Sequence, residues 1–134
     1  MAEPATGTCF PRDAYTAACP CRELLDLLAN KWSALALGAL EDGPRRFGAL
    51  RAKLEGISPK MLTQTLRRLE ELALVDRVVY PAVPLHVEYS LTPLGRDACI
   101  PLGELRRWVE SNVDRIPVLT PADDANVGRS TRSN

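Results

Sequence analysis

Residues 57–74 carry the clearest two-faced helical pattern in the chain. Ser58 and Pro59 predict its start, because a serine hydroxyl caps a helix and proline suits the first turn. At 100° per residue the apolar face holds Leu62, Thr65, Leu66, Leu69 and Ala73, and the opposite face holds Lys60, Thr63, Gln64, Arg67 and Glu71. Taken alone, this pattern is typical of an ordinary amphipathic surface helix with a solvated polar face.

The segments before this helix predict three further helices. Clustered leucines indicate a helix over 21–28, and Asn30 can end it and cap the next one, which runs from Lys31 towards Gly43. Arg45 and Arg46 then form an extended link into a third helix, 47–55, which Gly56 closes. Because so few residues separate this helix from the two-faced one, the pair predicts a helix-turn-helix.

The pattern changes after Leu74. Valines and alternating residues predict two strands, 75–80 and 87–91, and prolines at 81 and 84 place the turn between them. A hairpin directly behind a helix-turn-helix is a wing. A long helix follows from Thr92-Pro93 to about Ile116, and we expect Pro101 to kink or break it. Its apolar stripe, with Trp108 beside it, exceeds the needs of one small core, so part of it is predicted to pack on a second copy.

These elements predict an α+β fold: a winged helix-turn-helix with a two-stranded wing and N- and C-terminal dimerisation helices. The length of 134 residues suits one domain, expected over 19–116. Residues 1–18 are predicted to form a flexible arm with a short helix near 13–18, and 117–134 a disordered tail. With neither a signal sequence nor a membrane-spanning apolar run, the protein is expected in the cytoplasm, away from membranes.

Charge strengthens the case for nucleic acid. The chain has no net charge, yet residues 44–68 carry a net +6 and the segments on either side carry −3 each. Concentrated positive charge is the signature of a phosphate-binding surface. The polar face of the two-faced helix can read base edges, since glutamine pairs with adenine and arginine with guanine. The candidate DNA-contacting residues are Arg46, Arg51, Ser58, Lys60, Thr63, Gln64, Arg67, Arg68, Arg77 and His86.

Four motifs together resemble the HxlR-type winged-helix regulators, which are relatives of the MarR group: CPCRELLDLLANKW, RFGALRAKLEGISPKMLTQTLRRLEEL, VDRVVYPAVPLHVEYSLTPLG and the later Trp108. The resemblance implies a homodimer, a recognition helix over 58–72 and a wing around 81–87. It also implies that a cysteine ahead of the first long helix, here Cys19, senses oxidants or electrophiles. Ala73 stands where the family usually ends this helix with glycine, so another form of C-cap is expected.

The cysteine positions also allow a sensing role on chemical grounds. Cys19 lies near a predicted helix N-terminus, with Arg22 and Lys31 as candidate neighbouring cations, and both effects favour thiolate. Cys21 can resolve an oxidised Cys19 or pair across a dimer. Cys99 is expected to be buried and inert. The spacing does not fit a structural zinc site, and with one histidine and no glycine-rich phosphate loop neither a metal, a cofactor nor an enzyme is predicted.

The sequence therefore predicts a sequence-specific transcriptional regulator, a repressor that binds a pseudo-palindromic operator in double-stranded DNA as a homodimer. Modification of Cys19 by a small oxidant or electrophile would release it. Two alternatives stay open: a winged-helix regulator that responds to a non-covalent small-molecule ligand, and a winged-helix protein-interaction module that binds no DNA. The local positive charge favours the DNA-binding interpretations.

Overall fold

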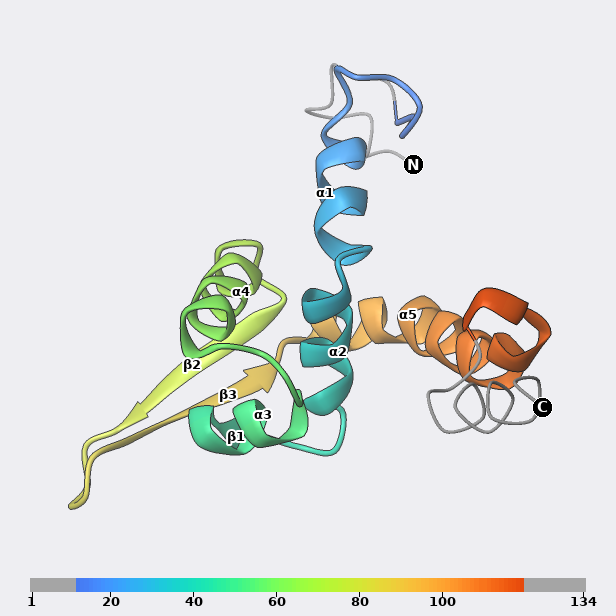
Figure 1. Cartoon of the computed structure of the whole chain (residues 1–134). Helices are drawn as coiled ribbons and strands as arrows, with labels where there is room; N and C mark the ends of the chain where they lie inside the picture. The colour runs from blue at the N-terminus through green and yellow to red at the C-terminus, as the bar shows by residue number, and fades with distance from the viewer. Residues whose placement is uncertain (1–11, 120–134) are drawn as a thin grey trace, which may run out of the picture. The chain divides into compact units, whose positions relative to one another are not determined.

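The computed structural model describes residues 12–119 (Figure 1). The elements, in chain order, are α1 (Pro20–Leu28), α2 (Lys31–Ala39), β1 (Arg45–Arg46), α3 (Phe47–Lys53), α4 (Pro59–Glu71), β2 (Val75–Tyr80), β3 (His86–Leu91), α5 (Pro93–Asn112) and the 3₁₀ turns η1 (Val113–Arg115) and η2 (Pro117–Leu119). The winged helix-turn-helix prediction is confirmed: α3 and α4 form the helix-turn-helix, and the β2–β3 hairpin behind them is the wing.

The sheet has one more strand than the sequence predicted. Strands β2 and β3 pair antiparallel from Val75↔Leu91 to Tyr80↔His86, and residues 81–85 form the wing tip. The extended link β1 adds to the other edge of β3, giving the order β1-β3-β2. Two arginines carry no strand signal of their own, so this pairing is set by the tertiary fold. It joins the start of α3 to the base of the wing.

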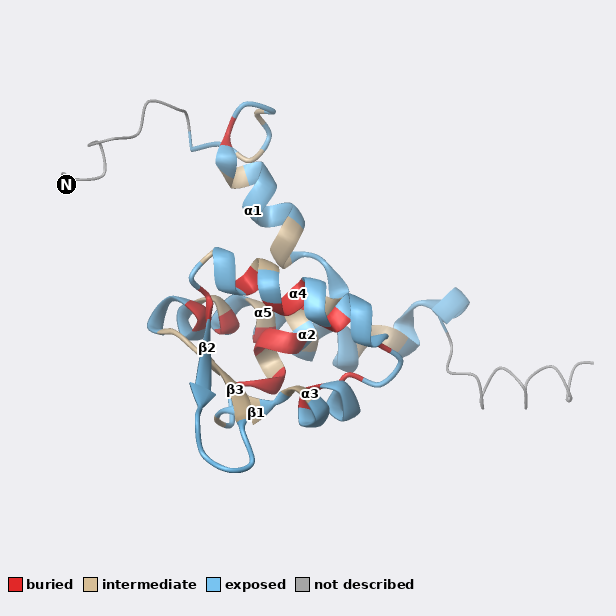
Figure 2. Ribbon diagram, turned by 90° about the vertical axis from the view of Figure 1, so that its left-hand side faces the viewer, coloured by how far each residue is buried: buried red, intermediate tan, exposed pale blue. Residues whose placement is uncertain are grey.

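The core lies where α2, α3 and α4 meet (Figure 2). Its largest fully buried side chains are Leu37, Leu40, Leu50, Leu62, Leu66, Leu69 and Val75. Three of them belong to the predicted apolar face of α4, which confirms that orientation. Asn30 caps α2 as predicted, because its side-chain oxygen accepts hydrogen bonds from Trp32 N (2.9 Å) and Ser33 N (3.3 Å).

Helix α4 begins as predicted and ends in an unusual way. The Ser58 hydroxyl accepts a hydrogen bond from Met61 N (3.0 Å) at the N-cap, ahead of Pro59. At the other end, Ala73 N donates to Glu70 O and Leu74 N donates to Leu69 O, both at 3.0 Å. This pair of bonds is a Schellman motif, which places Ala73 at the left-handed position with φ +62°. Ala73, which stands in place of the expected glycine, is therefore held in the left-handed conformation that glycine adopts more readily.

Replacing Ala73 with glycine should stabilise the fold. The left-handed conformation costs an L-residue about 1–2 kcal/mol, and glycine regains part of that after its larger loss of entropy on folding. We expect the free energy of unfolding to rise by about 0.5–1 kcal/mol in urea titrations, with an unchanged dependence on urea concentration. Ala29→Gly is a suitable control, because Ala29 caps α1 at φ −79°. The control should lose stability, and equal effects of both changes would contradict the strain at Ala73.

A predicted short helix is absent, and the break that was one of the two effects expected at Pro101 does not occur. Residues 13–19 form turns rather than a short helix, with Thr16 N bonded to Asp13 O and Cys19 N bonded to Thr16 O. The Asp13 carboxylate accepts a hydrogen bond from Tyr15 N (3.0 Å), which offers the backbone an alternative to a helix. Pro101 does not break α5, which continues from Pro93 to Asn112. Pro101 and the residue four positions before it are exposed, so water can satisfy the freed carbonyl.

The chain divides into two compact units, with the boundary between Cys99 and Ile100 inside α5. The first unit contains the winged helix-turn-helix together with α1 and the first turns of α5. Within the second unit, α5 ends in the short 3₁₀ turns η1 and η2. Among residues 12–119, no helix has both the length and the apolar character that a membrane crossing requires. The remainder of the predicted arm and tail lies outside the described residues.

Candidate nucleic-acid interface

The polar face of α4 is exposed over its whole length. Lys60, Thr63, Gln64 and Arg67 all lie on the surface, while the apolar face of the same helix is buried. Their spacing of three and four residues places them side by side on one face. The side chains therefore present one amide, one hydroxyl and two cations from a rigid helix, and this chemistry suits base edges and phosphates.

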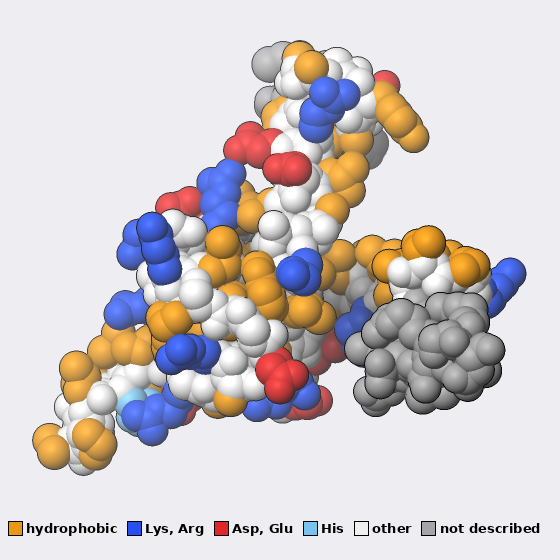
Figure 3. All heavy atoms as spheres, viewed as in Figure 1, with side chains coloured by type: hydrophobic (Ala, Val, Ile, Leu, Met, Phe, Trp, Pro, Cys, Tyr) orange, Lys and Arg blue, Asp and Glu red, His pale blue; other side chains and the backbone are white. Residues whose placement is uncertain are grey.

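More positive charge surrounds this face. Arg46 lies at the junction of β1 and α3, and Arg51 and Lys53 lie in the last turn of α3, all exposed. Basic side chains gather over α3 and α4 in the space-filling view (Figure 3). Ser58 is exposed between these helices. Its hydroxyl caps α4, so Ser58 has at least a structural role. The first turn of α4 and the end of α3 thus form one basic surface.

Two arginines of the basic segment 44–68 are bound by other groups of the protein. The Arg68 guanidinium forms ion pairs with Glu23 of α1 (2.7 Å) and Glu71 of α4 (3.2 Å). These two hydrogen-bonded carboxylates, Glu71 first, raise the pKa of Arg68. Arg45 donates to Ala39 O (2.6 Å) and lies 3.8 Å from Asp42. The sequence predicted Arg68 only as a candidate DNA contact, and its pairing with Glu23 could not be predicted, because no local pattern joins residues 45 positions apart.

The wing carries the last two candidate contacts. Arg77 is exposed on β2, opposite Tyr89 in the ladder. His86 stacks on Tyr80 with ring centroids 4.8 Å apart, and its Nε2 lies 3.4 Å from Glu88. This stacking closes the base of the wing tip, so His86 has a structural role there. Arg77 is the better placed of the two for a backbone or groove contact.

Cys19 and Cys21 form a second candidate site at the start of α1. The Cys19 Sγ takes the N-cap position and accepts a hydrogen bond from Cys21 N (3.1 Å). Burial raises the pKa of Cys19, but several hydrogen bonds, those with Cys21 first, together outweigh it and leave the pKa below its ordinary value. The pKa of Cys21 is raised, first by its side-chain hydrogen bond with Cys19 and then by burial. Cys19 is thus the member of the pair that favours thiolate.

The neighbours of Cys19 differ in part from the sequence prediction. The Arg22 side chain donates to the carbonyls of Ala14 (3.1 Å) and Tyr15 (2.8 Å), so it fixes the preceding turn instead of pairing with sulfur. Lys31 lies over the Trp32 ring at 4.6 Å, beyond the other end of α1. The helix N-terminus, rather than a cation, therefore supports the Cys19 thiolate.

The third described cysteine behaves as predicted. Cys99 is buried in α5, its sulfur lies 3.5 Å from Leu37 O, and burial raises its pKa. It is a structural thiol with little thiolate character. Within residues 12–119, no three His, Cys, Asp or Glu side chains come together as a metal site.

Residues 27–117 match the HxlR-like helix-turn-helix family, and this range covers the helix-turn-helix, the wing and α5. The chain belongs to the HxlR-like helix-turn-helix family. It is a helix-turn-helix transcriptional regulator, and this HxlR-like family implies DNA binding.

Relatives of this HxlR-like protein agree with that assignment. It is 45% identical over 98 residues to the uncharacterized HTH-type transcriptional regulator YtfH of Escherichia coli K12, covering 73% of this chain and 78% of the relative. It is similar to the ytfH regulator structure from Salmonella typhimurium (44% identity, TM-score 0.73, 78% and 93% covered). It is also similar to the redox regulator HypR in its oxidized form (39% identity, TM-score 0.66, 70% and 97% covered).

Proposed function

We propose that this HxlR-like protein is a homodimeric repressor that binds a pseudo-palindromic operator and is released when an oxidant or electrophile modifies Cys19. The observation that carries the DNA-binding part is the exposed face of α4, with Lys60, Gln64 and Arg67 displayed on a buried scaffold. Such a helix places its first turns in the major groove, and two copies would read half-sites about one DNA turn apart.

Exposed apolar side chains support the dimer. On α5, Leu105, Trp108 and Val109 are exposed at the spacing i, i+3, i+4, so they share one face of that helix. An exposed apolar stripe of this kind is a mark of a protein–protein interface, and tryptophan is enriched at such interfaces. A second copy of the chain is the partner that a pseudo-palindromic site requires.

The geometry of Cys19 supports the sensing part. Cys19 as a whole is only 3% exposed, yet it borders a surface hollow of about 450 Å³ through which a small oxidant would approach. Because Cys19 caps α1, oxidation of its sulfur would alter the acceptor that Cys21 N uses and so disturb this cap. Glu23 lies in the same first turn and is ion-paired to Arg68 of the recognition helix. A change in this turn would therefore be transmitted to α4 through the Glu23–Arg68 ion pair. The redox regulator HypR offers a precedent among structural relatives.

Replacing Cys19 with serine should separate DNA binding from release. A serine hydroxyl can cap α1 as the sulfur does, so operator affinity should stay within about twofold of wild type. Diamide or a quinone should release the wild-type protein and leave Cys19→Ser bound. The measurement is an electrophoretic mobility shift on a duplex selected from a random library, with and without oxidant.

Cys99→Ser is the matched control, because Cys99 is equally buried but has a raised pKa. It should respond to diamide like the wild type. Release of Cys19→Ser by diamide would contradict the sensing role. Failure of the wild type to select any duplex would instead favour the protein-interaction alternative.

A further inference from the structure

Lys31 and Trp32, the first two residues of α2, interact with each other next to the helix-turn-helix. The Lys31 ammonium lies over the Trp32 ring, 4.6 Å from its centroid. The Asn30 side-chain oxygen accepts a hydrogen bond from Trp32 N (2.9 Å), which fixes the backbone at this residue. The face of a tryptophan ring attracts a cation, so the ring restricts where the lysine side chain can lie.

The Trp32 ring also lies against the turn between α3 and α4. A methyl group at Gly56 would meet the Trp32 Cη2 atom at 3.9 Å, which is an ordinary van der Waals distance. Gly56 has φ +96°, a conformation that favours glycine, and it precedes the Ser58 cap of α4 by two positions. The ring therefore connects the start of α2 with the residues that lead into α4, and it brings the Lys31 charge to this place.

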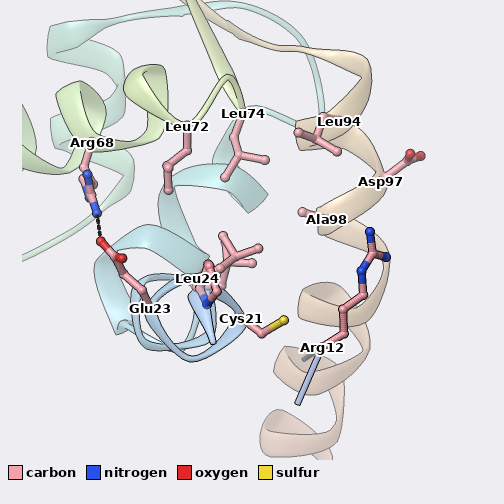
Figure 4. A pocket seen from close by; sticks show the side chains of 12 residues that line it. Arg12, Cys21, Glu23, Leu24, Arg68, Leu72, Leu74, Leu94, Asp97 and Ala98 are labelled. Carbon is pink, nitrogen blue, oxygen red and sulfur yellow. Dashed lines mark hydrogen bonds and ion pairs between the residues drawn. The ribbon is translucent and has the colours of Figure 1, made fainter. Parts of the chain in front are cut away.

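The Lys31 ammonium is available to a negatively charged partner. Lys31 is exposed, and it forms no ion pair within residues 12–119. Arg68 is the contrasting case, because Figure 4 shows its guanidinium directed towards Glu23 of α1, to which it is ion-paired at 2.7 Å. Lys31 also lies outside the basic segment 44–68. The fold thus adds a cation to the surroundings of α4 that the charge pattern along the sequence does not reveal.

We propose that Lys31 binds a backbone phosphate of DNA at the edge of the groove that α4 enters, and that Trp32 positions it there. This inference rests on the proposed function. The first turns of a recognition helix enter the major groove, so the residues just before that helix lie near the phosphates that border the groove. Lysine binds phosphate as a compact charge, and such contacts fix the orientation of a protein on the duplex without reading its sequence.

The test compares full-length Lys31→Met with the wild type on the duplex selected for operator binding. Methionine keeps much of the apolar stem and removes the charge. Loss of the contact should make the plot of log affinity against log salt less steep by about 0.9 per chain. At about 100 mM salt, affinity should fall about tenfold or more, and by the same factor on single base-pair variants of the duplex. Fluorescence anisotropy over a series of salt concentrations measures both effects.

Two further variants separate charge from structure. Lys31→Arg keeps the charge and should have the salt dependence of the wild type. Arg96→Met removes an exposed cation on α5 and should also leave the salt dependence unchanged. Thermal unfolding followed by circular dichroism should give the same melting temperature for Lys31→Met and the wild type, since Lys31 is exposed.

The positioning role of Trp32 is tested by a double-mutant cycle. Trp32→Leu should weaken DNA binding by a larger factor in the wild type than in the Lys31→Met protein, because the ring acts through the lysine. Equal factors in the two backgrounds would contradict the positioning role.

The outcomes separate this inference from the proposed function. If the wild type binds the duplex and Lys31→Met has an unchanged salt dependence, the phosphate contact is overturned and DNA recognition stands. A loss of affinity at only one base pair would also overturn it, because Lys31 would then read a base. A folded wild-type protein that binds no duplex would overturn the proposed function together with this inference.

Discussion

Gly95→Ala is expected to lower the free energy of unfolding by about 3 kcal/mol or more, and the melting temperature by about 10 °C or more. A methyl group on Gly95 would overlap the backbone carbonyl oxygen of Leu74, and it would also approach Leu91 Cδ2 at 3.3 Å. A backbone carbonyl cannot move aside as a flexible side chain can. Thermal unfolding followed by circular dichroism measures the effect.

Hydrogen bonds at the same junction explain why the loss of stability should extend to α4. The Thr92 hydroxyl donates to Ala73 O (2.7 Å) and accepts from Gly95 N (2.9 Å), and Thr92 N donates to Leu74 O (3.2 Å). These bonds tie the end of α4 to the start of α5. A shift of Gly95 would therefore move α4 as well.

Gly38→Ala is the control for this change. Gly38 lies inside α2, and a methyl group there would meet nothing within 4 Å. Alanine is the better helix former, so this variant should gain about 0.5–1 kcal/mol. A Gly95→Ala protein as stable as the wild type would show that the junction can relax, contrary to the close approach described here.

Arg67→Ala and Gln64→Ala are each expected to weaken operator binding about 10- to 100-fold. Both side chains are exposed on the polar face of α4, in the turns that would enter the major groove. If a side chain reads a base edge, its removal should also relax discrimination at one base-pair position. Fluorescence anisotropy with the selected duplex and a panel of single base-pair changes measures both effects.

Arg96→Ala provides the matched control for charge. Arg96 is exposed like Arg67 but lies on α5. Its loss should change operator affinity less than about threefold. A similar loss from Arg96 and Arg67 would mean that general positive charge, rather than the α4 face, carries recognition.

The sequence was most informative about α4. A cap, a proline and an amphipathic period are local signals, so the start of the helix and its buried face could be predicted. The end of the helix was harder, because Ala73 adopts a conformation that its own preference opposes. Tertiary bonds at the Thr92 junction hold it there. Pro101 shows the reverse case, in which a strong local signal for a break is overruled.

The sequence predicted which residue types the candidate site contains, but it did not predict most of the contacts between them. Exposure of Gln64 and Arg67 follows from periodicity alone. The pairing of Arg68 with Glu23 and the pairing of β1 with β3 both join segments distant in sequence. Sequence patterns state which face of an element is apolar, but they do not state which distant segment meets it.

Two arginines that are bound by other groups of the protein limit how strongly its affinity for DNA can depend on ionic strength. Of the seven basic residues in 44–68, Arg45 and Arg68 are held by groups of the protein itself. The other five, Arg46, Arg51, Lys53, Lys60 and Arg67, are exposed and can displace condensed cations from DNA. At about 0.9 released cations per phosphate contact, this segment can contribute a logarithmic salt dependence of at most about 4.5 per chain. As long as Arg68 stays paired with Glu23 and Glu71, it links α4 to α1 and adds nothing to this salt dependence.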